Sequence, residues 1–256
     1  MNILVTNDDG IFARGIHLLT KGFQSFEDVN IYVCAPDQQR SCVGHGLTLF
    51  DDITLEDWPL DDFEGPVVWA KSCSGTPADC IRLALCVLGD SGVLIDMVCS
   101  GVNDGSNVGS DINYSGTIAA CREATIEGIP AIGFSCARGL KYGENFLRII
   151  PEIFGKFRGN IPPLTILNVN TTDLPWEELK GYRPARLAHI TYPCRYTPLE
   201  SEGGKQRFAF ASFTLDVLSK EEDADRNLVD NGYIAVSFIP LLQDAGSTMR
   251  DVEKLL

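Results

Sequence analysis

Two adjacent carboxylates stand where a buried strand is expected to end. Asp8 and Asp9 belong to the segment Asn7-Asp8-Asp9-Gly10, which follows the strand-like run 2–6. Neighbouring carboxylates repel each other and favour a neutralising cation, and divalent metals bind such hard oxygen ligands. Asp-Gly is also a common turn pair, so the segment taken alone is equally consistent with a solvated turn.

Two further strand ends supply neutral oxygen ligands. The segment APDQQRS at 35–41 ends in Ser41, and the segment SGVNDG at 100–105 contains Asn103. With Asp8 and Asp9, these side chains would form a shell of four protein oxygens. Such a shell leaves octahedral positions for water and substrate, as Mg²⁺ or Mn²⁺ prefers. The sequence therefore favours one divalent ion per chain.

A predicted helix start downstream has the chemistry of an anion site. The segment NYSGT at 113–117 contains Ser115, Gly116 and Thr117, and Asn107 precedes it. The backbone N–H groups of Gly116 and Thr117, together with the Ser115 hydroxyl, would form a cradle for a phosphate. Ser115 is equally well explained as a simple helix N-cap, and the two roles can coexist.

Alternating strand and helix patterns over the first 170 residues would position these segments. Strands are predicted at 2–6, 29–35, 66–70, 96–99, 131–136 and 164–169, and helices at 15–26, 76–88, 115–127 and 146–157. The helix at 76–88 has a capping-box start of Thr76, Pro77 and Asp79. This alternation predicts an α/β fold with a mainly parallel sheet and helices on both faces. Binding sites in such sheets lie at the carboxyl ends of the strands.

The remainder of the chain changes character. Strands are predicted at 186–192, 207–213 and 233–241, separated by long polar connections, with a short helix from about Ser247. We interpret residues 1–256 as a single domain in which roughly 186–232 form a hairpin-bearing extension before the chain returns to the body.

Composition narrows the class of protein. The chain has 256 residues and a formal charge of −14, so nucleic acid polymers and anionic membrane surfaces are disfavoured as partners. Its nine cysteines form no C-x-x-C pair, and no apolar run approaches the length of a membrane helix. Buried free thiols of a cytoplasmic protein explain this cysteine usage.

Several motifs in order resemble those of one known family. NDDG, APDQQRS, SGTPADC and SGVNDGSNVGSDINYSGTIAA, spread over residues 1–135, are similar to the motifs of the SurE "survival protein" 5′/3′-nucleotidases and acid phosphatases. NGYIAVSFIP near the C-terminus resembles the last core strand of that family. One departure is Gln38-Gln39, where the family usually has Arg-Asn, and the unusual loop CVGHG follows Ser41.

The resemblance implies roles for particular residues. It implies metal ligation by Asp8, Asp9, Ser41 and Asn103, and phosphate contacts from Asn107, Ser115, Gly116 and Thr117. Catalytic roles fall on Asp8, Asp9, Asn107 and Ser115. The resemblance also implies a Rossmann-like α/β body, with the extension at roughly 186–232 forming a protruding β-hairpin that is exchanged between subunits in a homodimer or homotetramer.

These observations predict a metal-dependent phosphomonoesterase for nucleoside 5′-monophosphates, with 3′-monophosphates left open. The alternatives are a broad acid phosphatase or exopolyphosphatase, and a non-catalytic nucleotide-sensing module. An aspartyl-nucleophile phosphatase would need a D-x-D motif, whereas Asp8 and Asp9 are adjacent. A deacetylase would need an HPDD-like strand end, and no histidine accompanies this pair. A serine hydrolase would need G-x-S-x-G, which the sequence lacks. His17 and His189 are interpreted as structural, and the loop residue His45 is left as a possible neighbour of the substrate.

Overall fold

A computed structural model describes residues 1–242, and only the backbone at residues 201 and 202. A central sheet contains strands β1 (Asn2–Thr6), β2 (Asn30–Pro36), β3 (Leu55–Asp57), β4 (Val67–Cys73), β5 (Met97–Asp104), β6 (Ala131–Ala137), β7 (Thr165–Thr172), β8 (Tyr182–Pro184) and β13 (Ile234–Pro240). The helices are α1 (Arg14–Gly22), α2 (Pro77–Asp90), α3 (Gly116–Ile126), α4 (Phe146–Phe157) and α5 (Asp225–Asp230). The predicted short helix from Ser247 lies outside the described residues.

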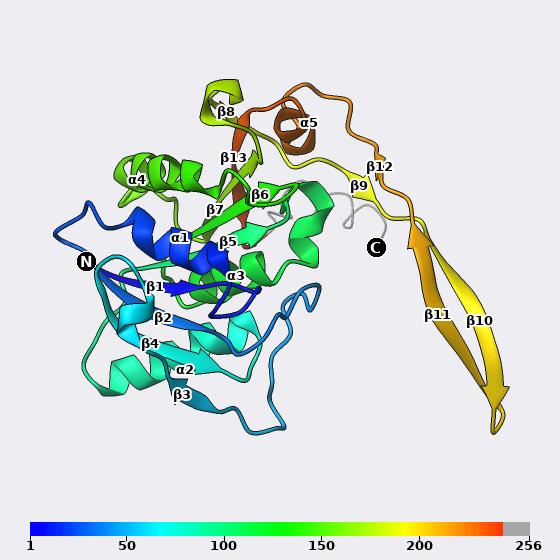
Figure 1. Ribbon diagram of the computed structural model, residues 1–256, viewed down its shortest axis with the longest axis horizontal. Helices are drawn as coiled ribbons and strands as arrows, with labels where there is room; N and C mark the ends of the chain where they lie inside the picture. Colours follow the sequence, from blue (N-terminus) through cyan, green and yellow to red (C-terminus); the bar gives the residue numbers. More distant parts are fainter. Residues whose placement is uncertain (243–256) are drawn as a thin grey trace, which may run out of the picture.

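The sheet has the strand order β3-β4-β2-β1-β5-β6-β7-β13-β8 (Figure 1). Neighbouring strands from β4 to β7 are parallel, whereas β13 is antiparallel to β7. The chain moves outward from β1 to β2 and β4, then returns to the other side of β1 to form β5, β6 and β7. The topological switch point therefore lies between β1 and β5, where open α/β sheets bind ligands.

Helices cover both faces of the sheet, as predicted. On one face, Ile3 and Val5 of β1 belong to a core with residues of α1 and α4. Leu4 points to the other face and belongs to a core with residues of α2 and α3. This alternation along a strand is expected when both faces are buried. The predicted mainly parallel, Rossmann-like architecture is confirmed.

The helix α2 begins as its sequence predicts. The Thr76 side chain accepts a hydrogen bond from the backbone N–H of Asp79, and the Asp79 carboxylate accepts from the N–H of Thr76 in return. Pro77 occupies the first helical position. This reciprocal box satisfies two backbone donors that would otherwise lack partners.

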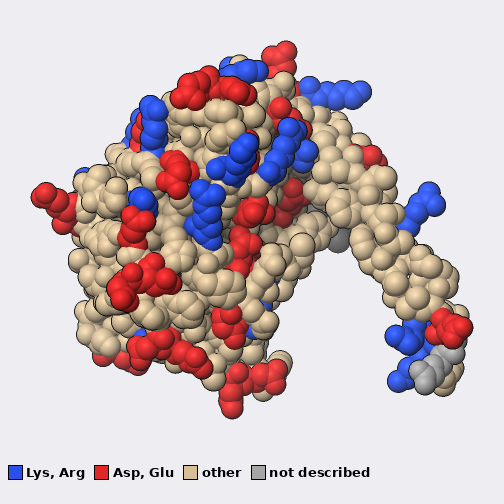
Figure 2. Space-filling model, in the orientation of Figure 1, with Lys and Arg blue, Asp and Glu red and all other residues tan. Residues whose placement is uncertain are grey.

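A long hairpin leaves the body of the molecule near the C-terminus. Strands β10 (Cys194–Glu202) and β11 (Lys205–Phe213) pair in antiparallel fashion, and the hairpin stands away from the sheet (Figures 1 and 2). It is joined to the body by the short strands β9 (Ile190–Thr191) and β12 (Asp216–Val217). The predicted hairpin extension is thereby found. Within residues 1–242, no helix combines the length and apolar character needed to cross a membrane.

The continuous strand predicted at 186–192 is wrong. Only Ile190 and Thr191 are in a strand there. The preceding segment is held instead by Asp225 at the start of α5, a helix the sequence pattern did not predict. The Asp225 carboxylate is buried and accepts hydrogen bonds from the backbone N–H groups of Ala188 and Gly109. These side-chain bonds replace a strand ladder that the apolar residues alone suggested.

Candidate active site

The loop after β1 is shaped by the side chain of Asn7. Its amide nitrogen donates to the carbonyl of Gly10 at 2.8 Å, and its amide oxygen accepts from the N–H of Gly10 at 3.2 Å. Gly10 has a φ of +103°, which favours glycine. The loop therefore holds Asp8 and Asp9 at the carboxyl end of β1, beside the switch point.

Asp8 is an almost fully buried carboxylate. It is 4% exposed, and its Oδ1 accepts a hydrogen bond of 2.5 Å from the hydroxyl of Thr117. The pKa of Asp8 is raised to about 6: burial and, to a smaller extent, the charge of Asp9 raise it, while the Thr117 hydroxyl and the Gly116 backbone lower it. Hydrogen bonds from neutral donors therefore do not fully offset the cost of burying the negative charge of Asp8.

Asp9 is half-buried and faces a hollow. Burial raises the pKa of Asp9, and so does the neighbouring charge of Asp104. The backbone N–H of Asp104 donates to Asp9 at 3.1 Å, which ties the end of β5 to the loop after β1. A pocket of about 450 Å³ lies beside these residues and is also lined by Gln39 and Arg14. This pocket has room for water and part of a substrate.

The segment after β2 lies against the same loop. The N–H of Arg40 donates to the carbonyl of Asp8 at 2.7 Å. The amide nitrogen of Gln39 lies 3.1 Å from Ser41 Oγ and 3.4 Å from Asp9 Oδ1. Gln39 therefore connects two of the predicted metal ligands, although its type departs from the family pattern. Ser41 itself is exposed.

An irregularity in β5 determines the position of Asn103. The pairing of β5 with β6 shifts register between Ser100 and Asn103. A side chain at Gly101 would approach the carbonyl of Phe134 to 2.3 Å, so this close passage requires glycine. The Asn103 amide nitrogen donates to the carbonyl of Gly105 at 2.8 Å, which leaves its amide oxygen for another partner. An oxygen is the atom that a hard cation requires.

The start of α3 approaches Asp8 closely. Ser115 is the N-cap, and its Oγ accepts a hydrogen bond from the N–H of Ile118 at 3.1 Å. Gly116 lies directly on Asp8, because a Cβ at that position would be 2.7 Å from Asp8 Cβ. The positive end of the helix therefore lies beside the buried carboxylate, and the predicted N-capping role of Ser115 is confirmed.

Asn107 is held by a buried amide network that the sequence analysis missed. Its backbone carbonyl accepts from the side-chain amides of Asn168 and Asn170 on β7, at 2.8 and 3.1 Å. Its own amide nitrogen donates to Ser135 Oγ on β6 at 2.9 Å. All four side chains are buried. The alternate asparagines in LNVN are a signal that could have identified them, because buried amides need partners.

His45 makes a structural contact in this arrangement. Its Nε2 lies 2.8 Å from the buried carboxylate of Glu123 on α3, which also accepts from Arg82 at 3.1 Å. The loop 42–46 is fixed further by the N–H of Gly44, which donates to the carbonyl of Tyr114 at 3.0 Å. These bonds fasten the loop after Ser41 over the start of α3.

The predicted ligand set suits a divalent cation. Within residues 1–242, no lysine or arginine forms an ion pair with Asp8 or Asp9. Two crowded carboxylates, one of them buried, are thus left with neutral donors only. Asn103 and Ser41 offer neutral oxygens from neighbouring strand ends. All the donors are hard oxygen atoms, which fit Mg²⁺ or Mn²⁺ better than Zn²⁺.

The fold and the site together define a Rossmann-like α/β protein with a paired-carboxylate site at its switch point. The family described as "Survival protein SurE" matches residues 3–193. The chain belongs to the SurE family. It is 42% identical over 250 residues to a protein of Trichormus variabilis called 5′-nucleotidase SurE, covering 93% of this chain and 91% of the relative.

Further comparisons cover the whole chain. A protein of Mannheimia succiniciproducens with the same name is 34% identical over 260 residues, covering 100% of this chain and 99% of the relative. The crystal structure of the SurE protein from Aquifex aeolicus superposes with a TM-score of 0.81 at 33% identity. It covers 100% of this chain and 99% of the other.

Proposed function

We propose that this chain is a divalent-metal-dependent phosphomonoesterase that removes phosphate from nucleoside 5′-monophosphates. The observation that carries the proposal is the buried Asp8 carboxylate, next to Asp9 and the N-terminus of α3, without a basic partner in the described chain. Relatives named 5′-nucleotidase SurE support the same activity and substrate class. Nucleoside 3′-monophosphates are a second substrate class to be tested.

Asp8, Asp9, Ser41 and Asn103 would hold one Mg²⁺ or Mn²⁺ per subunit. When bound, such an ion neutralises the carboxylates, polarises a phosphoryl oxygen and makes water more acidic. The carboxylates of Asp8 and Asp9 then no longer repel an anionic substrate. This matters in a chain with a formal charge of −14, whose average field opposes phosphate binding.

The residues at the start of α3 would bind the phosphate. Ser115 Oγ accepts from Ile118, so its hydroxyl hydrogen remains free to donate to a phosphate oxygen. The first backbone N–H groups of the helix, from Gly116 and Thr117, have no intrahelical acceptors, and that of Gly116 also faces the Asp8 carboxylate. Asn107, oriented by the buried amide network, supplies a further donor. Together these groups stabilise charge on the equatorial oxygens during phosphoryl transfer.

Asp9 would orient the attacking water. It lines the pocket of about 450 Å³ and is the more accessible of the two carboxylates. A carboxylate that accepts a hydrogen bond from a water molecule orients that water, so that a lone pair of the water oxygen points toward phosphorus. The phosphoryl group is then transferred directly to water, and no side chain becomes phosphorylated.

A panel of phosphoesters with metal present tests this function. We expect nucleoside 5′-monophosphates to release phosphate faster than p-nitrophenyl phosphate or tripolyphosphate. Faster release from the two simple substrates would instead indicate a broad acid phosphatase or exopolyphosphatase. Nucleotide binding without any phosphate release would indicate a nucleotide-sensing module.

The hairpin β10–β11 supports an assembly of identical subunits, a homodimer or homotetramer. It exposes Tyr196, Phe208 and Phe210, each more than half accessible, and the Tyr196 and Phe210 rings lie 5.7 Å apart. Figure 2 shows an open concave region between this arm and the body. Exposed aromatic patches of this kind mark protein interfaces.

We therefore expect Phe208→Ser/Phe210→Ser to shift the protein toward a monomer in light scattering. Because the hairpin is remote from the sheet, the body should keep its circular dichroism. A mass equal to that of the unsubstituted protein would contradict the role of the hairpin.

The nine cysteines are all free thiols, which supports a reducing cytoplasmic compartment.

A further inference from the structure

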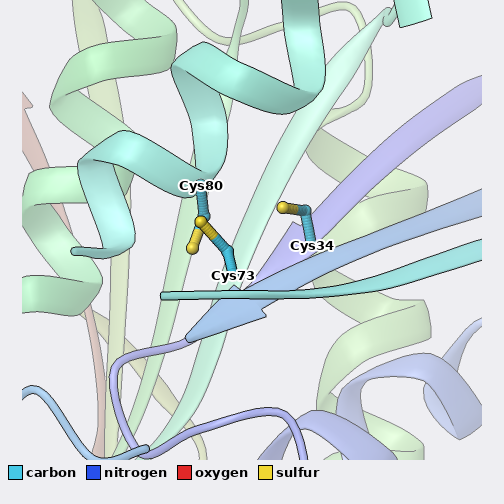
Figure 3. A group of neighbouring side chains, drawn as sticks. All are labelled: Cys34, Cys73 and Cys80. Carbon is cyan, nitrogen blue, oxygen red and sulfur yellow. The ribbon is translucent and has the colours of Figure 1, made fainter. Parts of the chain in front are cut away.

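Three cysteine side chains meet in the interior on the α2 face of the sheet. Cys34 comes from β2, Cys73 is the last residue of β4, and Cys80 lies in the first turn of α2 (Figure 3). Their Sγ atoms all lie within 4.8 Å of one another, and all three residues are fully buried. The cluster is separate from the carboxylate site and has no part in the proposed hydrolysis.

The backbone places these sulfur atoms with little freedom. In the pairing of β2 with β4, Cys34 is opposite Lys71 and Pro36 is opposite Cys73. Cys34 and Cys73 are therefore diagonal neighbours on the same face of the sheet. The short connection 74–76 and the capping box of α2 return Cys80 over them. Three ligands are thus preorganised on two strands and a helix.

Hydrogen bonds from Cys34 and Cys80 lower the pKa of Cys73, whereas the hydrogen bond to Cys73 raises the pKa of Cys34 and burial raises that of Cys80. The surroundings offer no other ligand. The N–H of Gly75 donates to Cys73 Sγ at 3.4 Å, and Cys80 lies near the positive end of α2. The neighbouring core residues, such as Leu4, Ile81 and Ala84, are apolar. In the part of the chain that the structure describes, no histidine or carboxylate completes the group.

We propose that Cys34, Cys73 and Cys80 form a binding site for one Cu(I) ion. Thiolate sulfur is a soft ligand that selects Cu(I), and this ion accepts a shell of three sulfurs. Structural Zn²⁺ almost always takes four ligands, and a fourth is missing here. Each thiol that binds as a thiolate releases its proton. The bound ion would cross-link β2, β4 and α2.

Cu(I) alone, titrated anaerobically into the reduced full-length protein, tests the proposal. The competitor is a chromophoric Cu(I) chelator. We expect the wild type to retain one equivalent against the chelator and to unfold at a higher temperature with the ion bound. The triple variant Cys34→Ala/Cys73→Ala/Cys80→Ala should retain none. The matched control Cys42→Ser/Cys86→Ser/Cys194→Ser alters the three exposed cysteines and should behave as the wild type.

X-ray absorption on the loaded wild type keeps the test independent of how the variants fold, and should show a shell of three sulfurs. The proposal is overturned if wild type yields its copper as readily as the triple alanine variant, or if only the exposed-cysteine variant loses it. Tighter retention of Zn²⁺ than of Cu(I) would also overturn it. So would seven reactive thiols instead of nine when the unreduced protein is denatured and titrated, since the cluster would then hold a disulfide.

Discussion

Asp8→Asn is expected to lower turnover of a nucleoside 5′-monophosphate by at least about 10²-fold, and Asp9→Asn by a similar factor. A loss of this size is typical when one strong transition-state contact is removed. Asn keeps the shape of the side chain and an oxygen for the Thr117 hydroxyl. The loss would therefore come from the missing negative charge, and not from a collapsed loop.

The same Asp8 substitution should stabilise the metal-free protein at neutral pH. Burial raises the pKa of Asp8 from 3.8 to about 6, so the folded state binds this proton more tightly than the unfolded state. The resulting stabilisation is complete below about pH 4 and is lost as the pH rises through 6. At pH 7 the ionised carboxylate then costs the fold about 3 kcal/mol, which Asn removes.

Denaturant unfolding of metal-stripped protein between pH 4 and 7 measures this effect. The wild type should lose stability relative to Asp8→Asn over that range. Asp90→Asn, at the exposed end of α2, is the matched control and should leave turnover unchanged, while the loss of a negative charge at a helix C-terminus should add at most about 1 kcal/mol of stability. Near wild-type turnover in Asp8→Asn and Asp9→Asn, with metal present, would show that these two residues form an ordinary turn without a role in catalysis.

Gly116→Ala is the second substitution with a large expected effect. The added Cβ would lie 2.7 Å from Asp8 Cβ, 3.0 Å from Pro77 Cγ and 3.1 Å from Asp8 Oδ2. These atoms belong to the backbone-fixed loop after β1 and to the start of α2, so α3 must move away from Asp8. Displacements of about 1 Å at a reacting centre cost up to about 10²-fold in rate, and we expect at least a tenfold loss.

Gly89→Ala provides the control for this substitution. Gly89 also lies in a helix, but a Cβ there meets no atom within 4 Å. Because alanine favours helix over glycine, this variant should gain up to about 1 kcal/mol of stability and keep its turnover. Equal turnover of Gly116→Ala and Gly89→Ala would show that the close contact between α3 and Asp8 is not needed for activity.

Local signals were sufficient to predict much of the fold. The capping box at Thr76 and the N-cap at Ser115 located the starts of α2 and α3, because both depend on side chains within three residues. The strand β10 was missed, since Pro198 and the charged residues around it weaken the strand pattern. Its pairing with β11 depends on partners across the hairpin, which periodicity along one strand does not record.

The candidate site was predictable where its residues lie at or just after the carboxyl ends of strands. Asp8, Asp9 and Asn103 were located in this way, because parallel strands bring their carboxyl ends to one edge of the sheet. The bond from Thr117 to Asp8 and the support of Asn107 by Asn170 were not predicted. Each joins residues more than 60 positions apart, and only the packing of α3 and β7 against the loops reveals them.

Phosphate release by metal-stripped wild-type protein, with single cations added back, tests the central claim most directly. The substrate is a nucleoside 5′-monophosphate, and the protein is dialysed against a chelator before the assay. We predict a loss of at least about 10²-fold on stripping, because neutral donors alone cannot offset the Asp8 and Asp9 charges beside an anionic phosphate. Mn²⁺ or Mg²⁺ should restore the rate. Undiminished turnover in excess chelator would contradict a metal-dependent site at these carboxylates.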